Sequence, residues 1–282
     1  MSKENEKQTA LAGDPQVPNA RSIKDDESSR RQGVWIVVPT LNEAKNILHL
    51  LNGIYSEMVG VPYYVCLVDD GSRDGTLDQV RFFTQSRRID NIHIIRREKR
   101  YRGSQRGAAV LAGLRYGLQH SNCRVFVEID ADLSHSPREL RTGIHAIGAL
   151  GFDVAIASKY MAKSRILNRP WTRRSLSFTY NWLLRRLVNS KIRDYSNGYR
   201  FYDRRCIEII CAHRIKYGSP IHLVETLAIL LASGMHVLEF PSTYVGRGEG
   251  VSKLRWMDII KAGAAMFEIS ARYHLNRLDR KY

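Results

Sequence analysis

Short, almost wholly apolar runs alternate with helix-like segments through residues 34–157, and this alternation constrains the fold more than any other feature of the sequence. Apolar runs of this length are typical of strands that are buried on both faces. They occupy residues 34–38, 63–68, 92–95, 124–129 and 153–157. Strands of this kind that alternate with helices form a mostly parallel sheet covered on both faces, so we predict an α/β fold.

Polar clusters directly follow three of the predicted strands. They are Pro39–Glu43, Asp69–Asp74 and Asp130–Ser134. In sheets of this class, ligands bind outside the carboxyl ends of the strands. Because all three clusters fall at carboxyl ends, we expect them to meet along one edge of the sheet and to form the active site there.

Two carboxylates stand two residues apart where the fourth predicted strand ends, in the sequence Asp130-Ala131-Asp132. Alternation along the strand would place both side chains on the same side, where they could bind Mg²⁺ or Mn²⁺. The alternative is an acidic turn that caps the helix expected to begin near Pro137. The pair alone does not decide between a metal site and a cap.

The other clusters indicate phosphate or nucleotide chemistry without a familiar nucleotide-binding motif. Asp69 and Asp70 could accept hydrogen bonds from ribose hydroxyls, and the basic segment Tyr101–Gly107 precedes a predicted helix, as phosphate-binding loops do. The sequence contains neither Gly-x-Gly-x-x-Gly nor Gly-x-x-x-x-Gly-Lys-Ser/Thr, which disfavours hydride transfer and P-loop ATP hydrolysis. His135 lies near the carboxylates, but packing explains it as well as ligation does.

The positive charge of the chain is concentrated in two segments. Residues 1–33 hold six basic and six acidic side chains and have the composition of a flexible tail, so the net charge of +16 belongs to the rest. Between Lys159 and Arg205 there are 13 Lys+Arg against two Asp, and between Arg87 and Arg106 eight against two. A solvated surface is the simpler explanation, but a surplus of this size predicts an anionic partner such as nucleic acid, nucleotide phosphates or acidic lipid.

Cysteine usage and hydropathy predict a cytoplasmic protein. The four cysteines are scattered and form no Cys-x-x-Cys pair, which disfavours a disulfide scaffold and a zinc ribbon. The longest stretch without Asp, Glu, Lys or Arg is the 13 residues from Thr226 to Leu238, whereas a spanning helix needs about 20. The N-terminus lacks the apolar segment of a secretory signal. We therefore expect no membrane span.

Nine segments resemble a known family in order and spacing. Pro39–Glu43, Val68–Thr76, Arg102–Ala109 and Asp130–Pro137 resemble the glycosyltransferase family 2 domain with the GT-A fold. The later segments resemble the polyprenol-phosphate sugar transferases, of which dolichyl-phosphate mannose synthases are the best known; they are Ala157–Tyr160, Trp171–Ser177, Asp194–Tyr202, the region of Glu225, and Arg247–Leu254. The resemblance predicts a catalytic domain over residues 34–255, followed by a C-terminal amphipathic helix and basic tail over residues 256–282.

The resemblance also implies roles for single residues. The nucleotide-sugar donor would contact Pro39, Leu41, Glu43, Val68, Asp70, Asp130, Ala131, Asp132, Lys159, Arg247 and Lys253. Asp130 and Asp132 would hold Mg²⁺ or Mn²⁺, with Ser134 as a further ligand, and Arg173 and Ser177 would receive the acceptor phosphate. Lys159 stands where the family usually has arginine, a change that keeps the charge and loses the bidentate fork.

The implied activity is transfer of a sugar, in the first place mannose from GDP-mannose, to a polyprenyl or dolichyl monophosphate with inversion at the anomeric carbon. A divalent ion together with Arg247 and Lys253 would neutralise the leaving diphosphate. The acceptor phosphate is already anionic and needs no base. This agrees with a sequence in which no catalytic base stands out.

Three alternatives stay open on the sequence. A family 2 transferase with a hydroxyl acceptor, on a polysaccharide or a small molecule, needs a base, for which Asp194 and Glu225 are candidates. A basic nucleic-acid-binding protein would explain the charge, but the sequence contains no recognisable nucleic-acid-binding motif, so we expect no nucleic-acid partner. A non-catalytic relative is disfavoured by the intact Asp130 and Asp132.

Because a polyprenyl phosphate stays in the bilayer, the resemblance implies peripheral association with an anionic membrane surface, either directly or through a membrane-spanning partner. An apolar stripe near the C-terminus has helical spacing and is one candidate for the contact. It comprises Trp256, Ile259, Ile260, Gly263, Met266, Phe267 and Tyr273, with Lys261, Arg272, Arg277, Arg280 and Lys281 around and beyond it. The alternative is that this stripe packs on the protein's own core.

Overall fold

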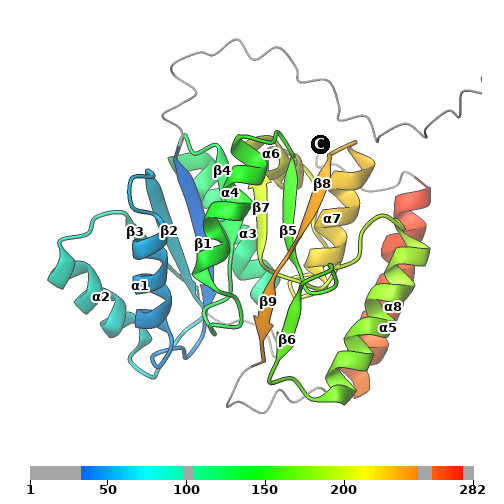
Figure 1. The fold of residues 1–282 in the computed structure, drawn as a ribbon, viewed down its shortest axis with the longest axis horizontal. Helices are drawn as coiled ribbons and strands as arrows, with labels where there is room; N and C mark the ends of the chain where they lie inside the picture. The colour runs from blue at the N-terminus through cyan, green and yellow to red at the C-terminus, as the bar shows by residue number, and fades with distance from the viewer. Residues whose placement is uncertain (1–32, 98–104, 247–255, 276–282) are drawn as a thin grey trace, which may run out of the picture. The chain divides into compact units, whose positions relative to one another are not determined.

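A seven-stranded sheet forms the centre of the fold (Figure 1). The computed structural model describes residues 33–97, 105–246 and 256–275. Neighbouring strands are parallel, except that β7 is antiparallel to both β4 and β5. From edge to edge the strands are β3 (Ile92–Arg96), β2 (Tyr63–Asp69), β1 (Val34–Thr40), β4 (Val125–Glu128), β7 (Arg200–Asp203), β5 (Val154–Ser158) and β8 (Val237–Pro241). A separate parallel pair consists of β6 (Arg165–Leu167) and β9 (Thr243–Val245).

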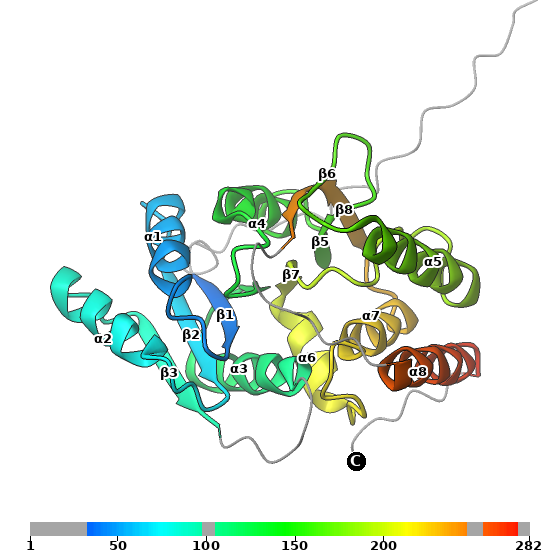
Figure 2. The same ribbon diagram turned by 90° about the horizontal axis from the view of Figure 1, so that it is seen from below.

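Helices cover both faces of the sheet (Figure 2). The core of one face includes side chains of α1 (Ile47–Glu57), α2 (Thr76–Arg87) and α4 (Leu140–Gly148), the last preceded by a 3₁₀ turn at Pro137–Glu139. The core of the other face includes α3 (Arg106–His120), α6 (Arg204–Ala212) and α7 (His222–Ala232). Beside α7, the long helices α5 (Trp171–Leu187) and α8 (Trp256–His274) pack against each other.

The five strands predicted from the apolar runs are all present, with ends one or two residues from the expected positions. The predicted mostly parallel α/β architecture is confirmed. The apolar-run pattern misses β7, because this strand begins with Arg200 and ends with Asp203. The strand is nevertheless buried over its first three residues, since it lies between β4 and β5 in the middle of the sheet.

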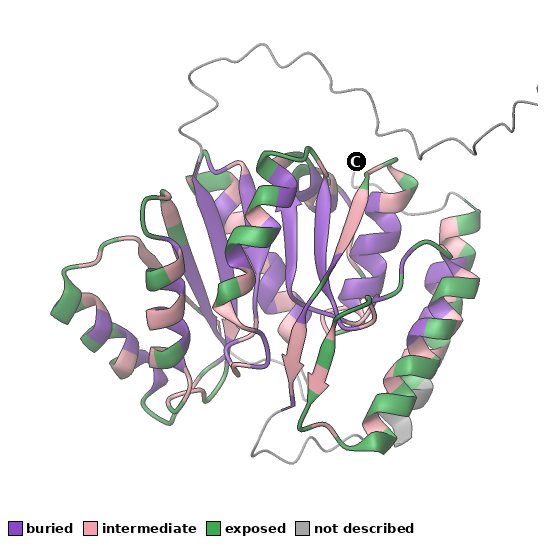
Figure 3. Ribbon diagram, in the orientation of Figure 1, coloured by how far each residue is buried: buried purple, intermediate pink, exposed green. Residues whose placement is uncertain are grey.

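Close packing between α3 and β1 fixes the distance between the helix layer and the sheet. All residues of β4 and β5 are buried, and β1 is buried except at Pro39 (Figure 3). The fully buried Trp35 of β1 donates a hydrogen bond from Nε1 to the carbonyl oxygen of Gly113 at 3.1 Å. One turn further along α3, a Cβ added at Gly117 would collide with the same indole ring. The helix therefore needs glycine where it passes over the tryptophan.

The C-terminal helix α8 packs on the core. Met266 and Ile269 are 3% and 0% exposed and belong to the same apolar cluster as α7, and Tyr273 packs against that cluster. The prediction of a membrane-facing stripe is therefore wrong for Met266, where the packing alternative holds. Phe267 remains 59% exposed. None of the helices in the described ranges is both long and apolar enough to cross a membrane.

Several residues of the sequence-based predictions lie outside the described part of the chain. These are the tail up to residue 32, the basic segment 98–104, Arg247, Lys253, Arg277, Arg280 and Lys281, and the side chains of Trp256, Ile259 and Ile260.

We expect Gly117→Ala to destabilise the protein, although alanine favours a helix interior by about 1 kcal/mol over glycine. The added methyl group would displace the ring of Trp35, and overpacking of this kind costs about 1–3 kcal/mol. Gly263→Ala in α8 is the matched control, because an added Cβ there meets no atom within 4 Å. Urea unfolding should give a lower free energy of unfolding for Gly117→Ala only. Equal stability of the two variants would mean that the tryptophan ring can move aside.

Candidate active site

The carboxyl ends of β1, β2 and β4 lie side by side, as the three polar clusters predicted. The parallel register pairs Thr40 with Asp69 across β1 and β2. On the other side of β1, Val37 pairs with Glu128, the last residue of β4. The acidic pair at Asp130 and Asp132 follows directly, so all three clusters open on the same edge of the sheet.

The predicted donor-binding residues of β1 and β2 gather at this edge. Pro39 and Val68 are partners in the register, and Val68 is fully buried while Leu41 is 38% exposed. The backbone N–H of Glu43 donates to Oγ1 of Thr76 at 2.9 Å. This bond ties the loop after β1 to the start of α2, so that the two loops hold one another in place.

The two aspartates at the carboxyl end of β2, Asp69 as its last residue and Asp70 directly after it, make different contacts. Asp69 Oδ2 accepts the backbone N–H groups of Gly71 and Ser72 at 3.1 and 3.0 Å, which shapes the turn. Asp70 is buried and forms an ion pair with Arg97, with 3.2 Å between Oδ1 and Nη1. Of the two, Asp70 presents its carboxylate beside a cation at the sheet edge, where the resemblance expects the nucleotide.

Asp130 and Asp132 follow the end of β4 and act on one another electrostatically. Asp130 Oδ1 accepts a hydrogen bond from Nε of Arg106 at 2.6 Å, and Asp132 Oδ1 accepts the backbone N–H of Ser134 at 3.0 Å. Burial raises the pKa of Asp130 and the charge of Asp132 adds to the rise, against the lowering effect of Arg106. Ala131 and Ser134 beside them are buried. Two mutually repelling carboxylates are stabilised when a cation binds between them.

The helix-cap alternative does not describe this acidic pair. The 3₁₀ turn that begins at Pro137 is capped by Ser136, whose Oγ accepts the N–H of Arg138 at 3.3 Å. In the described ranges, no group of three or more His, Cys, Asp and Glu side chains could hold a metal. Two carboxylates nevertheless suit Mg²⁺ or Mn²⁺, because these ions complete their ligand shell with substrate phosphates and water. Asp130 and Asp132 therefore fit an ion that binds together with a diphosphate.

Arg106 is a site residue that the sequence analysis did not single out. Nη1 donates to Oε2 of Glu128 at 3.2 Å, in addition to the bond from Nε to Asp130. Burial alone would raise the pKa of Glu128, but a hydrogen bond with His222 and the charge of Arg106 hold it at about 2. The only sequence signal is a basic residue at the start of a helix, which suggested phosphate contacts instead.

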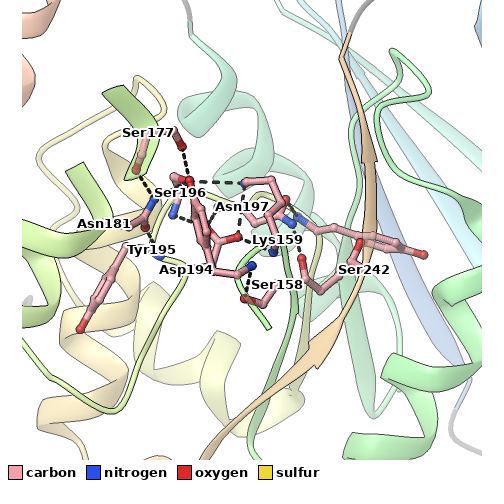
Figure 4. A network of polar contacts seen from close by, with 12 residues as sticks. Ser158, Lys159, Ser177, Asn181, Asp194, Tyr195, Ser196, Asn197 and Ser242 are labelled. Atoms are coloured by element: carbon pink, nitrogen blue, oxygen red, sulfur yellow. Dashed lines mark hydrogen bonds and ion pairs between the residues drawn. The ribbon is translucent and has the colours of Figure 1, made fainter. Parts of the chain in front are cut away.

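A second polar network connects β5 with α5 (Figure 4). Lys159 Nζ lies 3.3 Å from Oδ2 of Asp194 and 3.5 Å from Oγ of Ser196. From α5, Nδ2 of Asn181 donates to Oγ of Ser196 at 3.0 Å and to the carbonyl oxygen of Ser177 at 2.8 Å. The structure thus places Lys159, assigned to the donor by resemblance, in one network with Ser177, assigned to the acceptor.

Arg173 and Ser177 lie on α5, and both are half-buried, as expected from residues one helical turn apart. The hydroxyl of Tyr160 donates to Oγ of Ser177 at 2.8 Å. Ser177 is thus held from two sides, by Tyr160 at its hydroxyl and by Asn181 at its carbonyl oxygen.

Asp194, one of the two candidate bases, is fully buried and saturated with donors. Its carboxylate accepts the backbone N–H groups of Lys159, Ser196 and Asn197 at 2.9, 3.1 and 3.0 Å. Burial would raise the pKa of Asp194, but these bonds and the ammonium group of Lys159 lower it. A carboxylate that is buried, ionised and bonded in this way fixes the loop around it and cannot reach a substrate hydroxyl.

Glu225, the other candidate base, is also fully buried. It accepts the backbone N–H groups of Lys216 and Tyr217 at 3.0 Å and pairs with Arg272 of α8 at 3.2 Å. Its position on α7 makes it an anchor for the loop before that helix and for α8. Neither candidate base is therefore placed to activate an alcohol.

His135 packs between two tyrosine rings, with ring centroids 5.3 Å from Tyr199 and 5.4 Å from Tyr244. It is 2% exposed, and burial together with the charge of Lys159 lowers its pKa to about 3, so the imidazole is neutral. Of the two alternatives for this residue, the structure shows packing. Two cations also lie over the ring of Tyr244: Nζ of Lys159 is 5.3 Å from the ring centroid, and Cζ of Arg169 is 5.2 Å from it.

The side chain of Arg200 is fully buried and holds backbone segments in place beside the candidate site. Its Nε, Nη1 and Nη2 donate to the carbonyl oxygens of Asn197, Leu223 and Tyr195 at 2.9, 2.7 and 2.8 Å. The guanidinium thereby fixes the loop that carries Asp194 onto α7. Sequence reasoning missed this role, because nothing in the motif distinguishes a buried arginine from one that binds phosphate.

The chain is similar to known proteins over most of its length. Residues 35–210 match the family described as Glycosyl transferase family 2. The chain is 33% identical over 252 residues to the polyprenol monophosphomannose synthase of Mycolicibacterium smegmatis, covering 88% of this chain and 90% of the relative. It is 29% identical over 225 residues to the undecaprenyl-phosphate mannosyltransferase of Micrococcus luteus, covering 78% and 87%.

Two solved structures share the fold. A mannosyltransferase from Pyrobaculum calidifontis in complex with GDP-Man and Mn²⁺ matches with a TM-score of 0.54 and 18% identity, covering 88% of this chain and 71% of that one. Glucosyl-3-phosphoglycerate synthase from Mycobacterium tuberculosis matches with a TM-score of 0.61 and 15% identity, covering 87% and 82%. The fold is that of the GT-A glycosyltransferases, and the chain belongs to glycosyl transferase family 2.

Proposed function

We propose that the protein transfers mannose from GDP-mannose to a polyprenyl monophosphate. The names of the relatives from Mycolicibacterium smegmatis and Micrococcus luteus support a polyprenyl phosphate acceptor and a mannosyl group. The observation that carries the proposal is the state of Asp194 and Glu225, which are both buried and fully engaged. With its candidate bases occupied, the site suits an acceptor that is already an anion.

With a phosphate acceptor, transfer of the sugar needs only one displacement step. A phosphate monoester has its second pKa near 6, so it is largely a dianion at neutral pH and loses no proton when it reacts. An oxygen of this phosphate attacks C1 of the sugar while the bond from C1 to the diphosphate oxygen breaks. The nucleoside diphosphate leaves with the bonding electron pair, and the configuration at C1 is inverted. Arg173 and Ser177 are the residues that would hold the attacking phosphate.

On the donor side, Pro39, Leu41, Glu43, Val68 and Asp70 would hold the nucleotide at the ends of β1 and β2. Asp130 and Asp132, with Ser134 as a further ligand, would bind Mg²⁺ or Mn²⁺, and this ion supplies charge neutralisation for the leaving diphosphate. Lys159, Arg247 and Lys253 would add positive charge near the diphosphate. The Mn²⁺ complexes of the two related folds support a divalent ion.

We also propose that the protein meets its acceptor at a membrane surface through the outer face of α5. This face carries large aromatic side chains: Trp171, Phe178 and Trp182 are 78%, 60% and 44% exposed. At 100° per residue these three positions lie on one side of the helix, with the exposed Arg174 and Arg185 beside them. Exposed tryptophan with arginine around it is typical of a helix that lies in the bilayer interface.

The positive charge in and around α5 indicates which kind of membrane the protein would bind. Residues 160–193, which include α5, hold nine Lys+Arg and no Asp or Glu. Each basic residue near an anionic bilayer contributes about 1 kcal/mol, and salt weakens the attraction. The surface therefore favours an anionic bilayer, and the inner side of the same helix carries Arg173 and Ser177. The cytoplasmic membrane face remains a prediction.

We expect Asp132→Asn to lower transfer by roughly 100-fold or more, because one of two charged metal ligands is lost. The amide oxygen of asparagine can still accept the N–H of Ser134, so the fold should persist. Asp90→Asn is the control, because Asp90 is exposed and precedes the amino end of β3, whereas the candidate site lies at the carboxyl ends of the strands. Product formation from GDP-mannose with Mn²⁺ measures the effect. Transfer at the wild-type rate would contradict the metal assignment.

Arg173→Ala should raise the concentration of polyprenyl phosphate needed for half-maximal rate by about 10-fold or more, because a charge-assisted bond to phosphate is lost. The affinity for GDP should stay within about twofold of wild type, and Arg81→Ala, at an exposed arginine of α2 outside the basic segment 160–193, should change neither quantity. Steady-state kinetics and equilibrium GDP binding separate the two effects. A fall in GDP affinity alone would mean that Arg173 belongs to the donor site.

The wild-type protein should co-sediment with anionic vesicles at low salt and be released at high salt. The triple variant Trp171→Ser/Phe178→Ser/Trp182→Ser should lose most of this binding. Phe82→Ser is the matched control, because Phe82 is 65% exposed on α2 and lies outside the proposed surface. Wild-type protein that stays in the supernatant at low salt would rule out direct docking, and equal loss in both variants would rule out α5 as the contact.

A further inference from the structure

Arg106 is held in one orientation by contacts to four partners. Besides Nε to Asp130 at 2.6 Å and Nη1 to Glu128 at 3.2 Å, Nη2 donates to the carbonyl oxygen of Gly198 at 3.1 Å. Nη1 also lies 3.4 Å from Nε2 of His222. The side chain is 15% exposed, so the guanidinium lies largely out of the solvent and can bond with few groups other than these.

The groups around Arg106 pack closely against it and against one another. A Cβ added at Gly198 would collide with the guanidinium, and one added at Gly107 would collide with the ring of His222. Glu128 is fixed from its other side, because Tyr202 donates its hydroxyl to Oε1 at 2.6 Å. The cluster thus joins the start of α3, the end of β4, β7 and α7 around a single guanidinium.

Of these contacts, the one to Asp130 differs from the rest, because only Asp130 leads into the proposed metal site. Arg106 donates from Nε to Oδ1 of Asp130, which constrains the position of that oxygen. A planar guanidinium can fix orientation in this way, whereas the ammonium of lysine acts as a point charge. The contacts to Glu128, Gly198 and His222 hold the guanidinium, and the guanidinium holds the carboxylate.

We infer that Arg106 is a positioning residue for Asp130, which it orients so that the carboxylate meets a divalent cation in one fixed geometry. The inference rests on the proposed metal site at Asp130 and Asp132. Groups that hydrogen-bond a metal-binding carboxylate are part of the site, and their loss typically lowers metal affinity by about 10- to 100-fold. The simpler explanation is that Arg106 only neutralises the buried Glu128.

A double variant separates these two roles. Arg106→Met alone would leave Glu128 charged and buried, which is expected to unfold the protein. In Arg106→Met/Glu128→Gln both charges are gone, methionine fills the volume of the arginine stem, and the glutamine oxygen still accepts the hydroxyl of Tyr202. If Arg106 serves Glu128 only, this variant should behave as wild type. If it positions Asp130, the variant should fold and bind metal weakly.

Arg205→Lys is the matched control. Arg205 Nη2 lies 2.6 Å from Oδ1 of Asp153, the same distance as in the Arg106–Asp130 contact. Asp153 precedes the start of β5, at the opposite edge of the sheet from the site. Arg106→Lys is a fourth protein in the series, because it keeps the charge beside Asp130 and loses the fork.

Mn²⁺ is titrated into each full-length protein in the presence of GDP, with UDP in parallel, and free Mn²⁺ is followed by electron paramagnetic resonance. The thermal unfolding midpoint of each protein is measured in parallel with the titration. We expect a 10- to 100-fold loss of Mn²⁺ affinity in the double variant at near wild-type thermal stability, a smaller loss in Arg106→Lys, and none in Arg205→Lys.

Wild-type or tighter Mn²⁺ binding in a folded double variant would overturn the inference alone and leave the proposed function standing. Mn²⁺ binding that is lost only in proportion to thermal stability, in the control as well, would also overturn it. Failure of the wild-type protein to bind Mn²⁺ with either nucleotide would overturn the metal site of the proposed function, and the inference with it.

Discussion

Buried charge is the constraint on which the carboxyl edge of this sheet depends. The side chains of Asp194, Glu128 and Arg200 are at most 1% exposed. A buried charged side chain is tolerated only when other polar groups replace the water molecules that would solvate it at the surface. Asp194 and Arg200 are bonded to the backbone of the loop before β7, and Glu128 is bonded to side chains of α3, β7 and α7. The loops that surround the site are consequently held by charges and not by apolar packing alone. Their positions are set before any substrate arrives.

The same constraint decides which carboxylates can take part in chemistry. Asp194 and Glu225 each accept several backbone N–H groups, so moving either carboxylate toward a substrate would take the acceptor away from these donors. Asp130 and Asp132 differ, because they stand two residues apart, and burial together with the charge of Asp132 raises the pKa of Asp130. The structure thus distinguishes the carboxylates that fix loops from the pair that we propose as metal ligands, which the sequence pattern could not do.

Much of the fold was predictable because apolar runs such as Val34–Val38 report burial on both faces directly. β7 was not, since Arg200 is a charged residue whose burial depends on carbonyl groups of Asn197, Leu223 and Tyr195. The stripe on α8 was ambiguous for a related reason. Helical spacing reports that one face is apolar, and Met266 shows that the surface it covers is the protein's own.

Parts of the candidate site that consist of residues close together in the sequence could be proposed from the sequence, whereas contacts between residues far apart in the sequence could not. Asp130 and Asp132 stand together in the sequence and at a strand end, and the three polar clusters follow from strand direction alone. Arg106 depends on Glu128, Gly198 and His222, which reach it from three other elements. A single sequence does not indicate that these residues contact one another, because none of them stands out in its own segment.

Helix α5 carries both the proposed membrane contact and the residues proposed to bind the acceptor phosphate. A lipid phosphate has an apolar tail that must stay in a bilayer and a charged head that must reach C1 of a sugar at the sheet edge. On α5, Trp171, Phe178 and Trp182 face outward, while Ser177 contacts Tyr160 and, through Asn181, the network of Lys159 and Asp194. The outward aromatic face and the inward polar side are fixed to one another by the helix itself. A membrane bound on the outer face would therefore present lipid headgroups at a defined height above the polar network. If α5 lies in the interface as proposed, the depth set by its aromatic side chains would also determine whether the phosphate reaches the sugar.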